Sequence, residues 1–172
     1  MLRCSPLIIF KNFDNLITDT KLTNPHPNNR DCGIIYLYVM KMLAVFGKLP
    51  EIDELFKYTK SADIISVLND VKNKVVRDIA PKEVKGWVIT AFYCALYSIY
   101  NIEDINDAFR FFITKKGDTD TNAAILGALY GAKLGFNELY KSDINKENIN
   151  VLLRNNLILK DIDDVVIALS RI

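Results

Sequence analysis

The chain has 172 residues, and 50% of them are hydrophobic. This length and composition suit one globular domain, which buries roughly 70% of the surface that its unfolded chain exposes. The 22 basic and 21 acidic residues are mixed along the chain and give a net charge of +1. The sequence therefore lacks the basic stripe of a nucleic-acid-binding protein, and we expect no nucleic-acid partner.

The cysteines and the apolar stretches indicate where the protein works. Cys4, Cys32 and Cys94 lie far apart and match neither a metal-ligand spacing nor a disulfide framework, which favours an intracellular, cytoplasmic location. The N-terminal segment has a very short apolar run and no small-residue cleavage site, so it makes a poor signal peptide. The most apolar stretches, residues 34–46 and 88–100, are short for a membrane span, and we predict no membrane partner.

Helical periodicity dominates the chain, and no segment alternates convincingly with the two-residue period of a strand. In chain order, the pattern predicts helices over residues 14–22, 32–47, 51–59, 62–79, 86–100, 103–113, 121–135, 146–154 and 162–171. The predicted fold class is all-α, in one domain over residues 1–172.

Punctuating residues set the predicted boundaries. Residues 23–31 read as a loop because they contain two prolines and three asparagines. The segments 32–47 and 86–100 are apolar on nearly all faces, which predicts two central helices. Gly47 is a plausible C-cap residue of the first, and Pro81 ends the amphipathic helix over 62–79.

Small residues recur in the segment 124–135. Gly127, Gly131 and Gly135 are four apart, and alanines form the adjacent row. Each glycine costs a helix about 0.5–1 kcal/mol relative to alanine. We therefore predict that this face packs closely against the backbone of a neighbouring helix, which would fix the start of its own helix rigidly.

Oxygen-bearing side chains come directly before that helix. If residues 118–120 are extended, Asp118 and Asp120 point the same way, and Thr121 opens the helix with its hydroxyl nearby. Two carboxylates and a hydroxyl suit Mg²⁺, Mn²⁺ or Ca²⁺. One of these residues could instead simply cap the helix. An EF-hand is excluded, because Ala123 and Leu129 occupy the positions of its glycine and its bidentate glutamate.

Three stretches together resemble one family. "GDTDTNAAILGALYGAKLG" resembles the C-terminal signature of the ADP-ribosylglycohydrolase family, a GGDTDT loop followed by a glycine- and alanine-rich helix. Upstream, "VKGWVITAFYCALYSI" resembles the family's GYVxxTLxxALWxF helix. "LRCSPL" and "DTKLTNPHP" resemble the segment NGSLMRxxPL…LTHPNP, so the resemblance runs from Leu2 to about Gly135.

The resemblance implies a fold and a chemistry. It implies a compact all-α bundle with a two-magnesium centre, in which Mn²⁺ can also serve, that hydrolyses the bond joining ADP-ribose to a protein side chain. Asp118, Asp120 and Thr121 fall on the family's C-terminal metal ligands. The expected mechanism has the metals orient the ribose hydroxyls and activate water, with an oxocarbenium-like transition state.

Some positions depart from the family pattern. Lys116 replaces the first glycine of the loop, and Asn24 stands where the family has histidine. The chain's one histidine, His26, is either a loop residue or a substrate contact. Trp87 replaces a tyrosine and either lines the ligand pocket or belongs to the core. We take Asn24, His26 and Trp87 as candidate substrate-binding residues.

The sequence also starts inside a family motif. The upstream part of the family domain, which supplies the other metal ligands, has no counterpart here, and the acidic residues 161–164 fit a helix N-terminus better. We expect either a separate chain that carries this N-terminal half or a non-catalytic relic with an interaction or structural role. The expected binding partner is an ADP-ribosylated protein or ADP-ribose.

Overall fold

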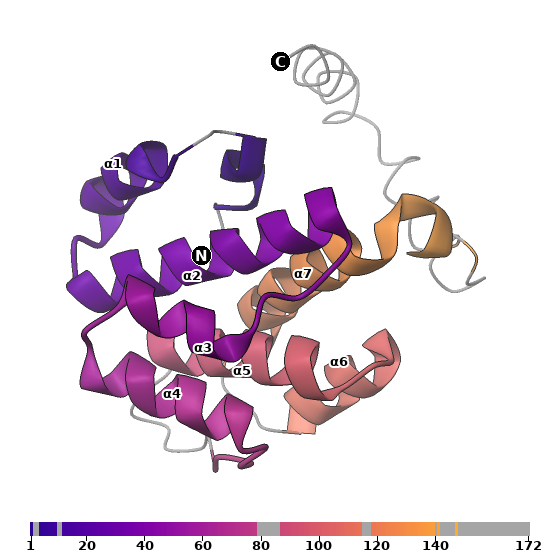
Figure 1. Ribbon diagram of the computed structural model, residues 1–172. Coiled ribbons are helices and arrows are strands. Elements are labelled where there is room, and N and C mark those ends of the chain that lie inside the picture. The colour runs from indigo at the N-terminus through magenta and orange to yellow at the C-terminus, as the bar shows by residue number, and fades with distance from the viewer. Residues whose placement is uncertain are drawn as a thin grey trace. The chain divides into compact units, whose positions relative to one another are not determined.

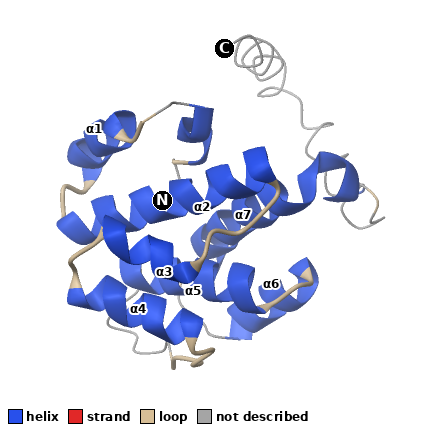
Figure 2. Ribbon diagram, viewed as in Figure 1, coloured by secondary structure: helices blue, strands red, loops and turns tan. Residues whose placement is uncertain are grey.

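The structure is all-α, as predicted. The computed structural model describes residues 1, 4–9, 12–78, 87–114, 118–139, 141 and 147, and within these ranges it contains helices and no strand (Figure 2). Its residues form two compact units, Met1–Lys133 and Leu134–Ile172. The single domain expected over residues 1–172 stays a prediction. The helices expected over 146–154 and 162–171 lie outside the described residues.

Figure 1 labels the α-helices. In chain order, the helices are η1 (Ser5–Ile9), α1 (Asp14–Thr23), α2 (Pro27–Phe46), α3 (Ile52–Leu55), η2 (Phe56–Tyr58), α4 (Ala62–Lys72), α5 (Val88–Asn101), α6 (Ile105–Thr114) and α7 (Thr119–Leu139).

Two helices, α2 and α5, form the centre of the first unit. They contact each other, α4 contacts both, α1 lies against α2, and α6 lies against α5 (Figure 1). Ten of the 14 residues of α5 are buried, which agrees with its all-round apolar sequence. Each fully buried large side chain, such as Tyr36 or Phe92, contributes about 1.5–3 kcal/mol from its apolar surface. None of the described helices is both long and apolar enough to cross a membrane.

The start of α2 differs from the sequence prediction. The helix begins at Pro27 instead of Cys32, so the loop expected over 23–31 shrinks to the three residues between α1 and α2. Proline is favoured at the first helical position, where its missing N–H has no partner to lose. His26 caps the helix, because its Nδ1 accepts a hydrogen bond of 3.1 Å from the N–H of Asn28. The other end is as predicted: Gly47 caps α2 in the left-handed conformation, with φ 64°.

α4 ends at Lys72, before the predicted end at residue 79, which lies outside the described residues. Lys74 then adopts a positive φ of 57°, which turns the chain away from the helix axis. Side chains of α5 satisfy the backbone groups that this turn frees. Tyr93 donates to the carbonyl of Val75 at 3.1 Å and accepts from the N–H of Arg77 at 2.9 Å. The early end of α4 is therefore a tertiary effect.

The glycines of α7 have different roles from the shared packing face that was predicted. A Cβ at Gly127 would lie 3.6 Å from the Phe109 side chain of α6, which is ordinary van der Waals contact. Gly135 is exposed, and a Cβ there would have no neighbour within 4 Å. Its φ of 74° and ψ of 165° break the helix. The expected close backbone approach is therefore wrong at Gly127 and Gly135.

We predict opposite effects of alanine at two of these glycines. Gly127→Ala should raise the free energy of unfolding by about 0.5–1 kcal/mol, because a helical position gains a tolerated methyl group. Gly135→Ala should lower it by about 1–3 kcal/mol, because this combination of φ and ψ is almost confined to glycine. Urea unfolding followed by circular dichroism measures both. Equal effects of the two substitutions would contradict the assignment.

We predict that Ser98→Ala stabilises the protein. The Ser98 hydroxyl is buried and has no hydrogen-bond partner among the described residues. Leaving a hydroxyl in this state costs about 1–3 kcal/mol. Ser66→Ala is the matched control, because Ser66 also lies inside a helix but its hydroxyl accepts a hydrogen bond from Arg77. Both changes gain the same helix propensity.

Ser98→Ala should therefore exceed Ser66→Ala in unfolding free energy by about 1 kcal/mol. Chemical denaturation midpoints, measured side by side, decide the outcome. A Ser98→Ala protein that is the less stable of the two would show that this hydroxyl is satisfied in solution.

Candidate functional site

The acidic motif lies at the start of α7. The carbonyl of Asp118 accepts a hydrogen bond of 3.1 Å from the N–H of Asn122, so Asp118 directly precedes the first helical residue, Thr119. Asp120 and Thr121 lie in the first turn. The extended conformation expected over 118–120 is therefore wrong, because the helix starts before Asp120. Lys116 and Gly117, which precede the motif, lie outside the described residues.

The side chains of Asp118 and Asp120 nevertheless lie close together at the start of α7. A hydrogen bond with the side chain of Asp118 lowers the pKa of Asp120, and the N–H groups of Thr121 and of Asp120 itself act in the same direction. Asp120 is fully exposed, and water screens its charge. The start of a helix also favours negative charge, because unpaired N–H groups point towards it. These hydrogen bonds therefore favour the charged form of Asp120.

Asp118 and Thr121 line a cavity of about 170 Å³. The other lining residues come from the start of the chain, from the loop before α2, from α2, from α5 and from α7: Met1, Asn24, Asn29, Val88, Ala91, Asn122 and Ile125. A second cavity, of about 190 Å³, shares Met1, Asn24 and Asn29 with the first. The structure therefore brings Asn24 to the same place as two of the three predicted metal ligands. Asp120 does not line this cavity.

The loop that carries Asn24 is held by side-chain amides. The Asn29 side chain donates to the carbonyl of Asn24 at 2.9 Å, and the Asn24 side chain accepts from the N–H of His26 at 3.3 Å. Because Asn29 lies in the first turn of α2, it ties the loop to the helix. Asn29 and Asn122 were not predicted from the sequence, although Asn122 follows Asp118 by four residues and thus lies near it at the start of the helix.

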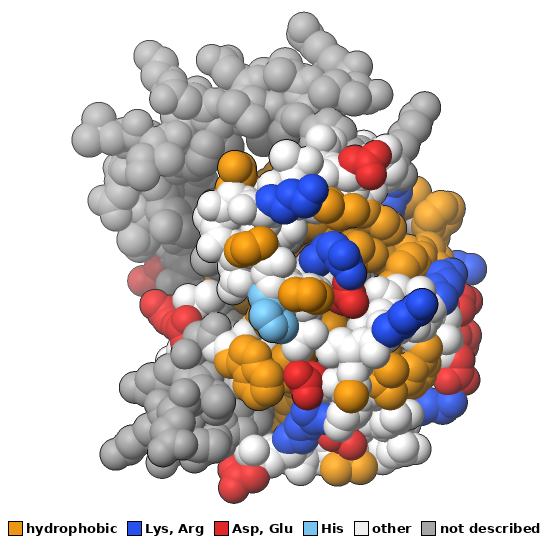
Figure 3. Space-filling model, turned by 90° about the vertical axis from the view of Figure 1, so that its left-hand side faces the viewer, with side chains coloured by type: hydrophobic (Ala, Val, Ile, Leu, Met, Phe, Trp, Pro, Cys, Tyr) orange, Lys and Arg blue, Asp and Glu red, His pale blue; other side chains and the backbone are white. Residues whose placement is uncertain are grey.

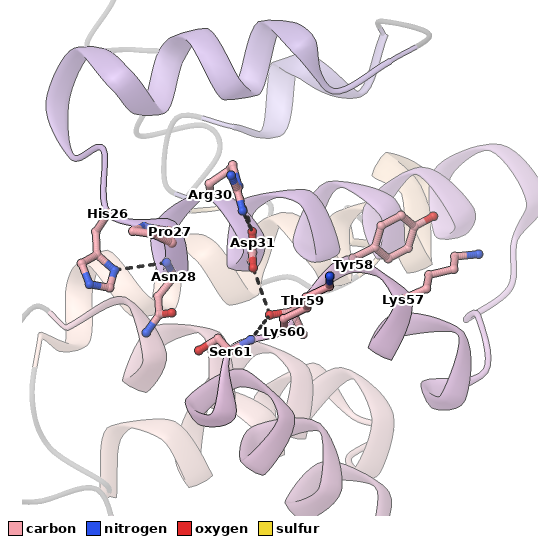
Figure 4. Close-up of a pocket in the computed structure, with 10 residues that line it drawn as sticks. All are labelled: His26, Pro27, Asn28, Arg30, Asp31, Lys57, Tyr58, Thr59, Lys60 and Ser61. Carbon is pink, nitrogen blue, oxygen red and sulfur yellow. Dashed lines mark hydrogen bonds and ion pairs between the residues drawn. The ribbon is translucent and has the colours of Figure 1, made fainter.

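His26 and Trp87 do not line the Asp118 cavity. His26 caps α2 and lies at one end of a separate cavity, which shares no lining residue with the Asp118 cavity (Figure 4). Figure 3 shows the face that carries the pale blue histidine, where hydrophobic side chains mix with charged ones of both signs. Trp87 precedes the first residue of α5 and is 44% exposed, so it does not belong to the core. Its neighbour Val88 does reach the Asp118 cavity.

A buried tyrosine connects the two helices that form the cavity. The Tyr36 hydroxyl of α2 donates to the carbonyl of Ile125 in α7 at 3.0 Å. The Ser5 hydroxyl lies 3.4 Å from the Tyr36 hydroxyl. Burial raises the pKa of Tyr36 to about 12, so the hydroxyl keeps its proton and its donor role at any physiological pH. This hydrogen bond joins the middle of α2 to the second turn of α7.

The donor set of the site is suited to a hard cation but is small. Asp118, Asp120 and Thr121 offer three side-chain oxygens, where Mg²⁺ takes about six oxygen ligands including water. Among the described residues, no group of three or more histidine, cysteine or acidic side chains lies close enough to hold a metal. The cysteines do not offer a nucleophile, since all three are buried and burial raises the pKa of Cys32.

Comparison with known proteins decides the family. The family model described as ADP-ribosylglycohydrolase matches residues 1–166. The chain belongs to the ADP-ribosylglycohydrolase family. Comparisons with curated proteins and with solved structures gave no match. Family membership agrees with the all-α fold, and it makes the cavity beside Asp118 the candidate active site of this glycohydrolase relative.

In this ADP-ribosylglycohydrolase relative, the cavity joins anionic and neutral polar groups. Carboxylate and hydroxyl oxygens come from the start of α7, and the amides of Asn24 and Asn29 come from the start of α2 and the loop before it. Val88, Ala91 and Ile125 supply apolar wall. Such a lining can hold a polyhydroxylated ring, because amides both donate to and accept from hydroxyl groups while the apolar wall covers the ring carbons.

We predict that the Tyr36 hydroxyl stabilises this arrangement. Tyr36→Phe should lower the free energy of unfolding by about 1 kcal/mol, because the buried carbonyl of Ile125 loses its donor. Tyr38→Phe is the matched control on the same helix, since the Tyr38 hydroxyl donates to Glu54 in an exposed position. Its effect should be less than half as large. Equilibrium denaturation compares the two, and equal losses would contradict the role given to Tyr36.

Proposed function

We propose that the protein takes part in magnesium-dependent hydrolysis of the glycosidic bond between ADP-ribose and a protein side chain. The observation that supports this most is the shared cavity: Asp118 and Thr121 from α7 line it together with Asn24, which precedes α2. The family's reaction needs anionic metal ligands beside a sugar-binding surface, and this cavity offers both kinds of group. Mn²⁺ is an alternative metal, because it accepts the same oxygen ligands.

The proposed role of the acidic motif is to hold the metal. Asp118, Asp120 and Thr121 would be the ligands, with the first turn of α7 fixing their spacing. When bound, the ion supplies positive charge that orients the ribose hydroxyls and stabilises the attacking oxygen. Asp118 and Thr121 face the cavity, so they are the two ligands nearest to a bound sugar. Asp120 is more exposed and completes the carboxylate pair.

The proposed role of the amide side chains is to position the sugar. Asn24, Asn29 and Asn122 would exchange hydrogen bonds with ribose hydroxyls and hold the anomeric carbon towards α7. Because the transition state is oxocarbenium-like, its positive charge would be stabilised by the carboxylate pair of Asp118 and Asp120. The apolar wall of Val88 and Ala91 would limit the approach of water to one side of the ring.

The protein is also proposed to work with a second polypeptide segment. Three oxygens fill about half of an octahedral magnesium shell, and such a site binds the ion weakly. The remaining ligands would come from a polypeptide carrying the N-terminal half of the family domain. The alternative is a non-catalytic helical protein that keeps the fold and acts through interaction, and the experiment below separates the two.

The experiment measures release of ADP-ribose from a mono-ADP-ribosylated protein. We expect little turnover and weak magnesium binding by the chain alone, and both should rise when the N-terminal half is added as a separate polypeptide. Excess chelator should remove the activity. Asp118→Asn and Asp120→Asn should each lower the restored rate by at least about 100-fold, because loss of a metal ligand forfeits several kcal/mol of charge stabilisation.

Asp107→Asn is the matched control. Asp107 is also an exposed aspartate in the first turn of a helix, but it lies in α6 and pairs with Arg110. Its replacement should leave the rate unchanged. Full magnesium-dependent turnover by the chain alone would refute the need for a partner. No turnover in the presence of the added half, with magnesium binding intact, would favour the non-catalytic alternative.

A further inference from the structure

A larger cavity shares no lining residue with the Asp118 cavity. Its volume is about 500 Å³, within the range of about 300–1,000 Å³ that is typical of small-molecule sites. Figure 4 shows its lining, which comes from the start of α2 and from the chain between η2 and α4: His26, Pro27, Asn28, Arg30, Asp31, Lys57, Tyr58, Thr59, Lys60 and Ser61. None of these residues has a role in the proposed hydrolysis.

The acid in this cavity is already neutralised. Asp31 is buried, and one of its carboxylate oxygens contacts the Arg30 guanidinium, with Nε at 2.9 Å and Nη2 at 2.8 Å. Its other oxygen accepts a hydrogen bond of 3.0 Å from the Thr59 hydroxyl, which in turn accepts from the N–H of Ser61 at 3.1 Å. These dashed contacts in Figure 4 connect α2 to the start of α4 and make one wall of the cavity rigid.

The remaining charge of the lining is positive. Three basic residues, Arg30, Lys57 and Lys60, face the single acid Asp31. Arg30 is paired with that acid, and the Lys57 ammonium lies over the rings of Tyr38 and Tyr58, 5.4 and 5.1 Å from their centroids. Lys60 is exposed and forms none of the ion pairs found in the described part of the chain.

Neutral donors accompany this positive charge. The Ser61 hydroxyl makes no capping bond to α4. The Nδ1 of His26 accepts a hydrogen bond, so its Nε2 carries the proton and is a donor. Asn28 adds an amide group to the lining, although its Nδ2 already donates to Asp63 at 3.1 Å. A ligand that matches this lining has one anionic group with several acceptor oxygens and a body large enough to fill the rest of the cavity.

We propose that this cavity binds the phosphate group of a small phosphorylated molecule. Lys60 provides the uncompensated positive charge, and the Ser61 hydroxyl donates to a phosphate oxygen. The Tyr58 ring and Pro27 contact the uncharged body of the ligand. The Arg30–Asp31–Thr59 network holds the cavity wall in place, and its hydrogen bonds stay the same when the ligand binds. The site is separate from the Asp118 cavity and does not depend on the hydrolytic function.

Titrations of the full chain followed by amide signals in nuclear magnetic resonance test this site. The probes are inorganic phosphate, glucose 6-phosphate and glucose, at constant ionic strength. The two phosphate compounds should shift the signals of Asn28 and Ser61 saturably, and the tighter of them identifies the source of the phosphate. Glucose should shift neither signal. The signal of Asn122, which reports the Asp118 cavity, should stay constant.

Two variants and a control complete the test. Lys60→Ala should weaken phosphate binding by about tenfold, because a charge-assisted contact is lost, while Lys60→Arg should keep most of it. Lys48→Ala is the control, since Lys48 is an exposed lysine that follows the opposite end of α2. Absence of saturable shifts at Asn28 and Ser61, equal weakening by Lys48→Ala, or unchanged binding by Lys60→Ala would each overturn the proposal.

Discussion

The hydrogen bond from the Tyr36 hydroxyl to the carbonyl of Ile125 joins residues that are 89 positions apart in the sequence. It lies between two buried helices whose first turns carry the polar groups of the candidate site. Because the hydroxyl keeps its proton at physiological pH and the acceptor is part of a helix, the contact has one geometry. The distance between the Asn24 loop and the aspartates of α7 therefore depends on how tightly α2 and α7 are held. The carboxylates of Asp118 and Asp120 are the candidate reactive groups, and Tyr36 helps to hold the helix that carries them in position.

Other tyrosine hydroxyls also donate hydrogen bonds to backbone carbonyls, here near the end of a helix or in a loop. Tyr130 donates to the carbonyls of Ser98 and Ile102 near the end of α5, and Tyr100 donates to the carbonyl of Pro50. The carbonyl of Pro50 lies in a loop and the carbonyl of Ile102 follows the end of α5, and without a donor each would cost free energy on burial, whereas the carbonyl of Ser98 also accepts from the N–H of Ile102. The first unit thus uses tyrosine side chains of α2, α5 and α7 to donate hydrogen bonds to backbone carbonyls of neighbouring segments.

Features of the fold that depend on neighbouring residues were predictable from the sequence, whereas those that depend on such long-range tyrosine contacts were not. The two central helices follow from apolar residues on all faces, a property that is local in sequence. Gly47 was also predictable, because glycine reaches the left-handed conformation without strain. The end of α4 was not, since its apolar stripe continues to Val75 while the Tyr93 hydroxyl from α5 takes the freed carbonyl. Pro27 could have indicated the start of α2, because proline is favoured at the first helical position. The asparagines around it instead led to the prediction of a loop.

The candidate site divides in a similar way. The aspartates and the threonine form a contiguous motif, and a contiguous motif is visible without a structure. The role of Asn29 could not be predicted from the sequence. Its side chain donates a hydrogen bond to the Asn24 backbone across a loop, and the shape of that loop depends on the cap at His26.

Trp87 gives the site one further property. It is the only tryptophan of the chain, it is 44% exposed, and its neighbour Val88 lines the Asp118 cavity. The protein thus carries a single tryptophan beside its candidate active site, and because tryptophan absorbs at longer wavelengths than the eight tyrosines, its emission can be excited selectively and reports on that region without any added label.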